Sequence, residues 1–108
     1  MGRTETIHDA QLYVELWTSL ASLLRSYCAA HGVHSNRHAT VEFGGEEIMA
    51  RHGEKWLSLG REGATVTWTR ENGSSGSMEI SDTGRLRSGT SEEEMDMAAE
   101  AWARELMQ

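Results

Sequence analysis

Four residues with metal-binding side chains lie within eleven positions of one another, where the first predicted helix ends: Cys28, His31, His34 and His38. Cys28 and His31 share a helical face, and thiolate and imidazole are ligands that suit Zn²⁺. The spacing C-x2-H-x2-H-x3-H matches no standard zinc pattern, and a second half-site is missing. Two interpretations therefore stay open, a Zn or Fe site and a buried thiol followed by solvated loop histidines.

Carboxylates form two clusters, at the first predicted hairpin and at the last predicted helix: Glu42, Glu46 and Glu47, and Glu92, Glu93, Glu94 and Asp96. Such clusters bind hard cations or mimic phosphate toward a basic partner. Acidic residues in a first helical turn are also favoured by the helix dipole, so we interpret the second cluster as a solvated cap. A Cys28–His31 nucleophile pair would lack an orienting acid. We therefore expect no enzyme and no bound cofactor other than the metal considered above.

Composition limits the class of protein. The chain has 108 residues, with 17 acidic against 10 basic side chains and a net charge of −7, which argues against nucleic-acid binding because phosphate contacts need clustered Lys and Arg. It contains no apolar run long enough for a membrane span and no secretory signal at its start. With the single cysteine, these features predict one domain over residues 1–108 in the cytoplasm.

The first helix is the element around which the others must pack. We expect a frayed tail over residues 1–5, a cap at Thr6 and a helix that ends at Gly32. Apolar residues cover roughly 200° of its circumference, about twice the width that one core needs. The helix must therefore be covered from two sides. The polar connector 33–37 follows.

Beyond the connector, the hydrophobic period changes from helical to alternating. Glycine-rich turns predict an antiparallel meander of five strands, at residues 38–43, 46–52, 55–59, 64–70 and 77–81. The loop 71–76 precedes the fifth strand, and a polar connector at 82–89 follows it. The last helix begins at a cap formed by Thr90 or Ser91, with Glu94 in a capping-box position. The predicted fold is therefore α+β, with an N-terminal helix, the meander and a C-terminal helix, both helices on one face of the sheet.

Alternation divides the strand residues into a core face and a solvated face. Met49 and Trp56 are the apolar exceptions on the solvated face. The predicted core contains Trp17, Leu20, Leu24, Phe43, Leu57, Val66, Trp68, Ile80 and Trp102.

The order helix, antiparallel sheet, helix in a small acidic chain, with the dipeptide Trp56-Leu57, resembles the frataxin fold of iron-binding assembly factors. That resemblance implies an acidic iron-binding surface on the first helix, where this chain has Asp9 and Glu15. Small acidic chaperones of bacterial secretion systems are similar too, although in them a helix usually interrupts the strands. No such helix is predicted here.

The leading functional hypothesis is a small acidic, non-enzymatic interaction module, such as a chaperone, an inhibitor or a regulatory adaptor, that forms a homodimer. Its expected partners are another protein or a second copy, with no nucleic acid and no membrane. Aromatic residues and Met are enriched at contact surfaces. The predicted interface residues are Leu12, Leu16, Leu23, Tyr27, Met49 and Trp56. The alternatives are a metal-handling protein and a small-ligand carrier with a site between helix and sheet.

Overall fold

The computed structural model describes the backbone of residues 2–32 and 39–108, and the side chains of residues 11–32 and 39–108. Helix α1 (Gly2–His31) leads into an antiparallel meander, and helix α2 (Met95–Met107) ends the chain. The strands are β1 (Thr40–Gly44), β2 (Glu47–His52), β3 (Lys55–Glu62), β4 (Thr65–Arg70), β5 (Ser75–Ile80), β6 (Arg85–Ser88) and β7 (Ser91–Glu94).

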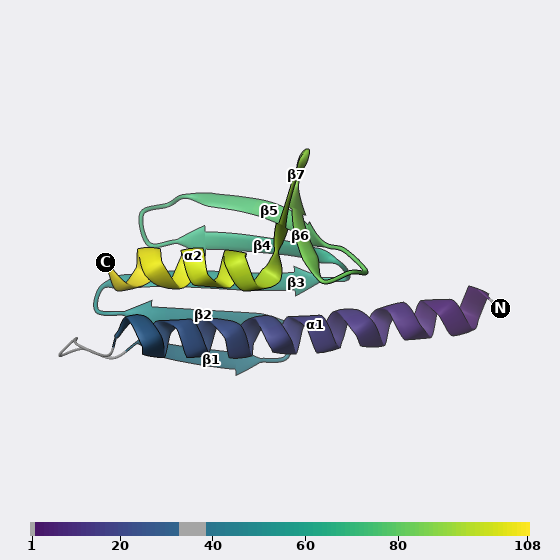
Figure 1. Cartoon of the computed structure of the whole chain (residues 1–108), viewed down its shortest axis with the longest axis horizontal. Helices are drawn as coiled ribbons and strands as arrows, with labels where there is room; N and C mark the ends of the chain where they lie inside the picture. Colours follow the sequence, from purple (N-terminus) through teal and green to yellow (C-terminus); the bar gives the residue numbers. More distant parts are fainter. Residues whose placement is uncertain (1, 33–38) are drawn as a thin grey trace.

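The strands form one sheet in sequence order, β1 to β7, and both helices lie on the same face of it (Figure 1). The predicted α+β class and the placement of the helices are thereby confirmed. The predicted number of strands is wrong, because the described residues form a sheet of seven strands rather than five.

The two additional strands lie where the sequence indicated a connector and a helix cap. Arg85 pairs with Glu94 in the hairpin of β6 and β7, and its guanidinium contacts the carboxylates of Glu94 at 3.0 Å and Glu92 at 3.8 Å. Gly89 allows the tight turn, since its φ is +62°. Consequently α2 begins at Met95, and Glu94 precedes it without a side-chain capping bond.

Helix α1 begins at Gly2, four residues before the predicted cap at Thr6, and it ends at His31 as expected. The Gly32 N–H donates to the carbonyls of Cys28 and Ala29, at 3.0 and 3.2 Å. In Figure 1 the first turns of α1 extend beyond the end of the sheet.

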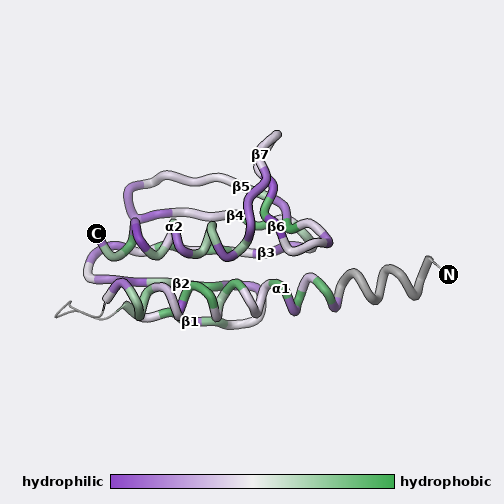
Figure 2. The backbone as a smooth tube through the Cα atoms, viewed as in Figure 1, coloured by the Kyte–Doolittle hydropathy of each residue, from purple (hydrophilic) through white to green (hydrophobic). Residues whose placement is uncertain are grey.

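A single hydrophobic core lies between the helices and the sheet, and Figure 2 shows hydrophobic positions recurring along α1 and α2 where they lie over the strands. Seven of the nine predicted core residues are buried. Trp68 is only partly buried, and Phe43 is 39% exposed because β1 is the edge strand of the sheet. The buried seven are Trp17, Leu20, Leu24, Leu57, Val66, Ile80 and Trp102.

Helix α2 supplies the second cover that the wide apolar stripe of α1 requires. The Tyr27 hydroxyl donates a hydrogen bond to Asp96 Oδ1 at 2.5 Å, and His31 Nε2 lies 2.7 Å from Glu100 Oε2. The two helices therefore pack side by side, joined by polar contacts along their solvent margin.

Candidate interaction surfaces

The sheet face opposite the helices, called here the outer face, carries mostly Ser, Thr and Glu. Because both helices lie on the other side, no described helix covers it (Figure 1). Trp56 and Met49 lie on this face and are half-buried. The two apolar side chains predicted on the polar face of the sheet therefore do lie on that face.

Strand register places a third residue beside them. Arg51 on β2 is directly opposite Trp56 on β3, and Met49 is opposite Ser58, so Met49 is the diagonal neighbour of Trp56. Arg51 is exposed and has no ion pair with any described residue. We call Met49, Arg51 and Trp56 the outer-face cluster. The sequence alone does not reveal the role of Arg51, because its position opposite Trp56 depends on the register.

The predicted interface residues on α1 lie elsewhere. Leu16, Leu23 and Tyr27 are partly buried and pack against the core, and Leu12 is partly buried too. Leu16 Cδ2 is 3.3 Å from the position that a Cβ on Gly84 would occupy, so this side chain contacts the turn between β5 and β6. Leu16, Leu23 and Tyr27 therefore pack, at least in part, within the chain itself.

The predicted metal-binding residues are only partly described, since His34 and His38 lie outside the described residues. Cys28 is buried, 3% exposed, and desolvation by burial raises the pKa of its thiol. His31 is exposed and contacts Glu100. Among the side chains that the structure describes, no three His, Cys, Asp or Glu residues are placed to hold a metal ion.

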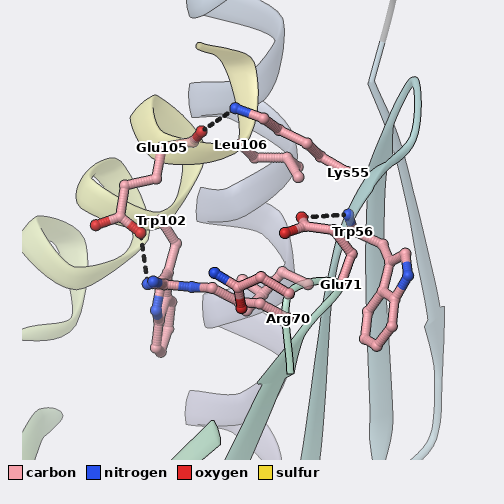
Figure 3. A pocket seen from close by; sticks show the side chains of 9 residues that line it. Lys55, Trp56, Arg70, Glu71, Trp102, Glu105 and Leu106 are labelled. Carbon is pink, nitrogen blue, oxygen red and sulfur yellow. Dashed lines mark hydrogen bonds and ion pairs between the residues drawn. The ribbon is translucent and has the colours of Figure 1, made fainter. Parts of the chain in front are cut away.

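A hollow of about 300 Å³ lies between the C-terminal end of α2 and the ends of β3 and β4 (Figure 3). Trp102 and Leu106 form its apolar wall. In Figure 3 the indole of Trp56 points away from α2, toward the outer face. A small-ligand site between helix and sheet would lie in a hollow such as this one.

The polar groups of the hollow are engaged by the chain itself. Lys55 Nζ donates to the carbonyls of Glu105 and Gln108, at 3.5 and 3.1 Å, and Arg70 forms an ion pair with Glu105. The Glu71 carboxylate accepts a hydrogen bond from the main-chain N–H of Trp56 at 3.1 Å, and Asn72 Oδ1 accepts one from the main-chain N–H of Ser74. The contacts of Lys55 and Arg70 tie the ends of β3 and β4 to the end of α2, which is a structural role.

Glu15, one of the two acids that the frataxin resemblance singles out, is exposed on α1, whereas the side chain of Asp9 is not described. None of the described helices has a stretch that is both long and apolar enough to span a membrane. Comparison of the chain with protein-family models, with curated proteins and with solved structures found no match.

Proposed function

We propose that this chain is a non-enzymatic protein-interaction module that binds another protein through the outer face of β1 to β3, with Trp56 as the anchor. The observation that carries the proposal is the outer-face cluster, which places Trp, Arg and Met together on a face that none of the described helices covers. Trp and Arg dominate the energetics of protein interfaces, and Met adapts to irregular partner surfaces.

Surrounding polarity supports the same proposal. The outer face beyond the cluster carries Thr65, Thr67 and Thr69 on β4 and Ser75 and Ser77 on β5, all exposed. An apolar centre with a polar rim is the usual anatomy of a transient interface.

Stability measurements test whether Trp56 serves folding or binding. We expect Trp56→Ala to cost about 1 kcal/mol or less in the free energy of unfolding, because the indole lies outside the core. Trp102→Ala, the matched control inside the core, should cost about 3–5 kcal/mol. Equal losses in urea unfolding would assign Trp56 to folding and remove the main support for the proposal.

Site-specific photo-crosslinking in the producing cells tests binding directly. The photoreactive residue p-benzoylphenylalanine replaces Trp56 on β3. In the control it replaces Ser77, which is on the same face but on β5, two strands away in the sheet. We expect a discrete crosslinked protein from position 56 alone, lost when Arg51→Glu is added. Identical products from both positions, or none from position 56, would contradict binding at the cluster.

A further inference from the structure

The turn that joins β4 and β5 contains the dipeptide Asn72-Gly73, whose chemistry allows modification without an enzyme. Asparagine is a thermally labile residue, because the main-chain nitrogen of the next residue can attack its carboxamide carbon. Glycine at that next position has no Cβ to hinder the approach. Asn72 and Gly73 are both exposed, so water reaches the reacting atoms.

The carboxamide of Asn72 is folded back over the turn. Its Oδ1 accepts a hydrogen bond from the main-chain N–H of Ser74 at 2.9 Å, two residues further along the chain. This side-chain turn spans Gly73, so it holds the carboxamide beside the main chain of Gly73. A donor at Oδ1 also favours the negative charge that this oxygen gains when its carbon is attacked.

The attacking nitrogen, in contrast, is restrained. The Gly73 N–H donates to the Arg70 carbonyl at 3.0 Å, and the Arg70 N–H donates to the Ser74 carbonyl at 2.9 Å. The Glu71 carboxylate ties the turn to β3, since it accepts the main-chain N–H of Trp56. Because the Gly73 nitrogen must lose its proton and turn toward the carboxamide carbon, its hydrogen bond to Arg70 must open before it reacts.

We propose that Asn72 is a site of spontaneous deamidation whose rate is set by opening of the turn between β4 and β5. In the opened turn the Gly73 nitrogen gives its proton to hydroxide and forms a bond to Asn72 Cγ. The Nδ2 group takes a proton from water and leaves as ammonia. Water then opens the cyclic imide at either of its carbonyls, which gives aspartate or isoaspartate at position 72. The net change is one water gained and one ammonia lost.

Either product adds a carboxylate at the rim of the hollow, which Glu71 and Asn72 both line. The net charge of the chain, −7, becomes more negative by one unit. In isoaspartate the main chain runs through the former side chain and is longer by one carbon, so the turn cannot close again with the same geometry. This modification does not depend on the proposed binding of another protein.

Incubation of the full chain at mildly alkaline pH, followed by peptide mass spectrometry, tests the proposal. We expect Asn72 to convert in the folded protein about 10-fold or more slowly than in denaturing urea, because the turn must open first. Asn36, which Arg37 follows, is the internal control and should convert more slowly than Asn72 in urea. Gly73→Ala should slow conversion at Asn72 in urea to the rate of Asn36.

Two variants of Glu71 separate opening of the turn from its charge. Glu71→Ala and Glu71→Gln both remove the carboxylate, but Gln keeps an oxygen that can accept the main-chain N–H of Trp56. In the folded protein, conversion at Asn72 should be about 2- to 10-fold faster in Glu71→Ala than in Glu71→Gln, as the loss of one hydrogen bond predicts. In urea the two variants should convert at the same rate. Circular dichroism checks that both are folded.

Three outcomes would overturn the proposal. The first is folded protein without any product at Asn72 after the denatured chain has converted completely. The second is an equal rate in the folded and the denatured wild type, or in folded Glu71→Ala and Glu71→Gln, which would show that the turn does not control the reaction. The third is conversion of Asn36 in urea as fast as that of Asn72.

Discussion

Trp68 and Gly76 face each other across β4 and β5, and the strand needs glycine at this point. A Cβ built on Gly76 would lie 2.7 Å from Trp68 Cζ2, closer than real side chains approach. The indole thus covers the glycine, and the Arg70 guanidinium lies over the same ring, 4.8 Å from its centroid. The residue that resembles a loop glycine in the sequence is therefore part of the sheet.

Gly76→Ala is expected to destabilise the fold by about 1–3 kcal/mol, because the ring of Trp68 must move to admit the methyl group. Urea unfolding measures the loss. Ser77→Ala, the neighbouring exposed position, should change stability by less than about 0.5 kcal/mol. Adding Trp68→Val should recover part of the Gly76→Ala loss through the removed clash. If Gly76→Ala matches the Ser77→Ala result, the close approach of the indole is wrong.

Cys28 should react slowly with thiol reagents in the native protein at neutral pH. Burial raises the pKa of its thiol and blocks access, and the thiolate is the reactive form. A colorimetric disulfide reagent should label it fully only when denaturant is added. Rapid stoichiometric labelling of the folded protein would instead indicate an accessible thiolate, as a metal-binding role would require.

At the scale of elements, α1 and α2 are held together by a buried apolar seam and by polar pairs at its margin. Leu20 of α1 belongs to the hydrophobic core and is fully buried, so Leu20→Ala should cost about 2–5 kcal/mol in the free energy of unfolding. Val14→Ala, on the exposed side of the same helix, is the control and should cost less than about 1 kcal/mol. Similar costs for the two variants would mean that the helix is rotated about its axis.

The Tyr27–Asp96 contact should make stability depend on alkaline pH. The hydrogen bond that Tyr27 donates to Asp96 is the main reason why the pKa of Tyr27 is raised. Desolvation and the negative charges of Asp96 and Glu100 raise this pKa further. Because the pKa of Tyr27 is raised, the stabilisation that its protonated hydroxyl gives the folded state is complete below the unfolded pKa of about 10. This stabilisation is lost as the pH rises through the higher pKa of the folded state.

Thermal unfolding of wild-type and Tyr27→Phe proteins across pH 8 to 11, about the range of tyrosine titration, measures this loss. The advantage of the wild type over Tyr27→Phe should shrink at the alkaline end of this range. A constant difference between wild type and Tyr27→Phe would show that Asp96 does not favour the protonated phenol.

The sequence predicts elements well where burial has a period. Small and large apolar residues recur at every second position, at Ile48 and Ala50 and at Leu57 and Leu59, so β2 and β3 are evident. Strands β6 and β7 are not evident, because Leu86 is their one buried residue and neither strand has buried residues at alternate positions. The acidic run at 92–94 suits a helix start equally well in the sequence.

The candidate surfaces divide in the same way. Trp56 and Met49 stand out because they interrupt a polar alternation, which the sequence shows directly. The exposure of Phe43 cannot be read from the sequence, because an edge position depends on the order of the strands and on what covers the strand. Wide apolar cover on α1 is evident from its sequence, but only the fold shows that α2 covers it.

At the scale of the whole molecule, one continuous core joins every layer. Leu24 of α1, Leu86 of β6 and Trp102 of α2 belong to the same buried cluster. Small domains with a single core unfold in one cooperative step. The β6–β7 hairpin should therefore unfold together with the helices, even though only one of its side chains is buried.

Urea unfolding followed by tryptophan fluorescence and by far-ultraviolet circular dichroism tests this cooperativity. Fluorescence reports on the core through Trp17 and Trp102, and dichroism reports on the helices. The urea midpoints of the two signals should coincide. Leu86→Ala should lower the free energy of unfolding by about 2–5 kcal/mol and shift both midpoints together, because removal of its side chain leaves a cavity in the shared core. Separate midpoints, or a Leu86→Ala variant in which only one signal shifts, would instead divide the chain into independently unfolding parts and contradict the single-domain prediction.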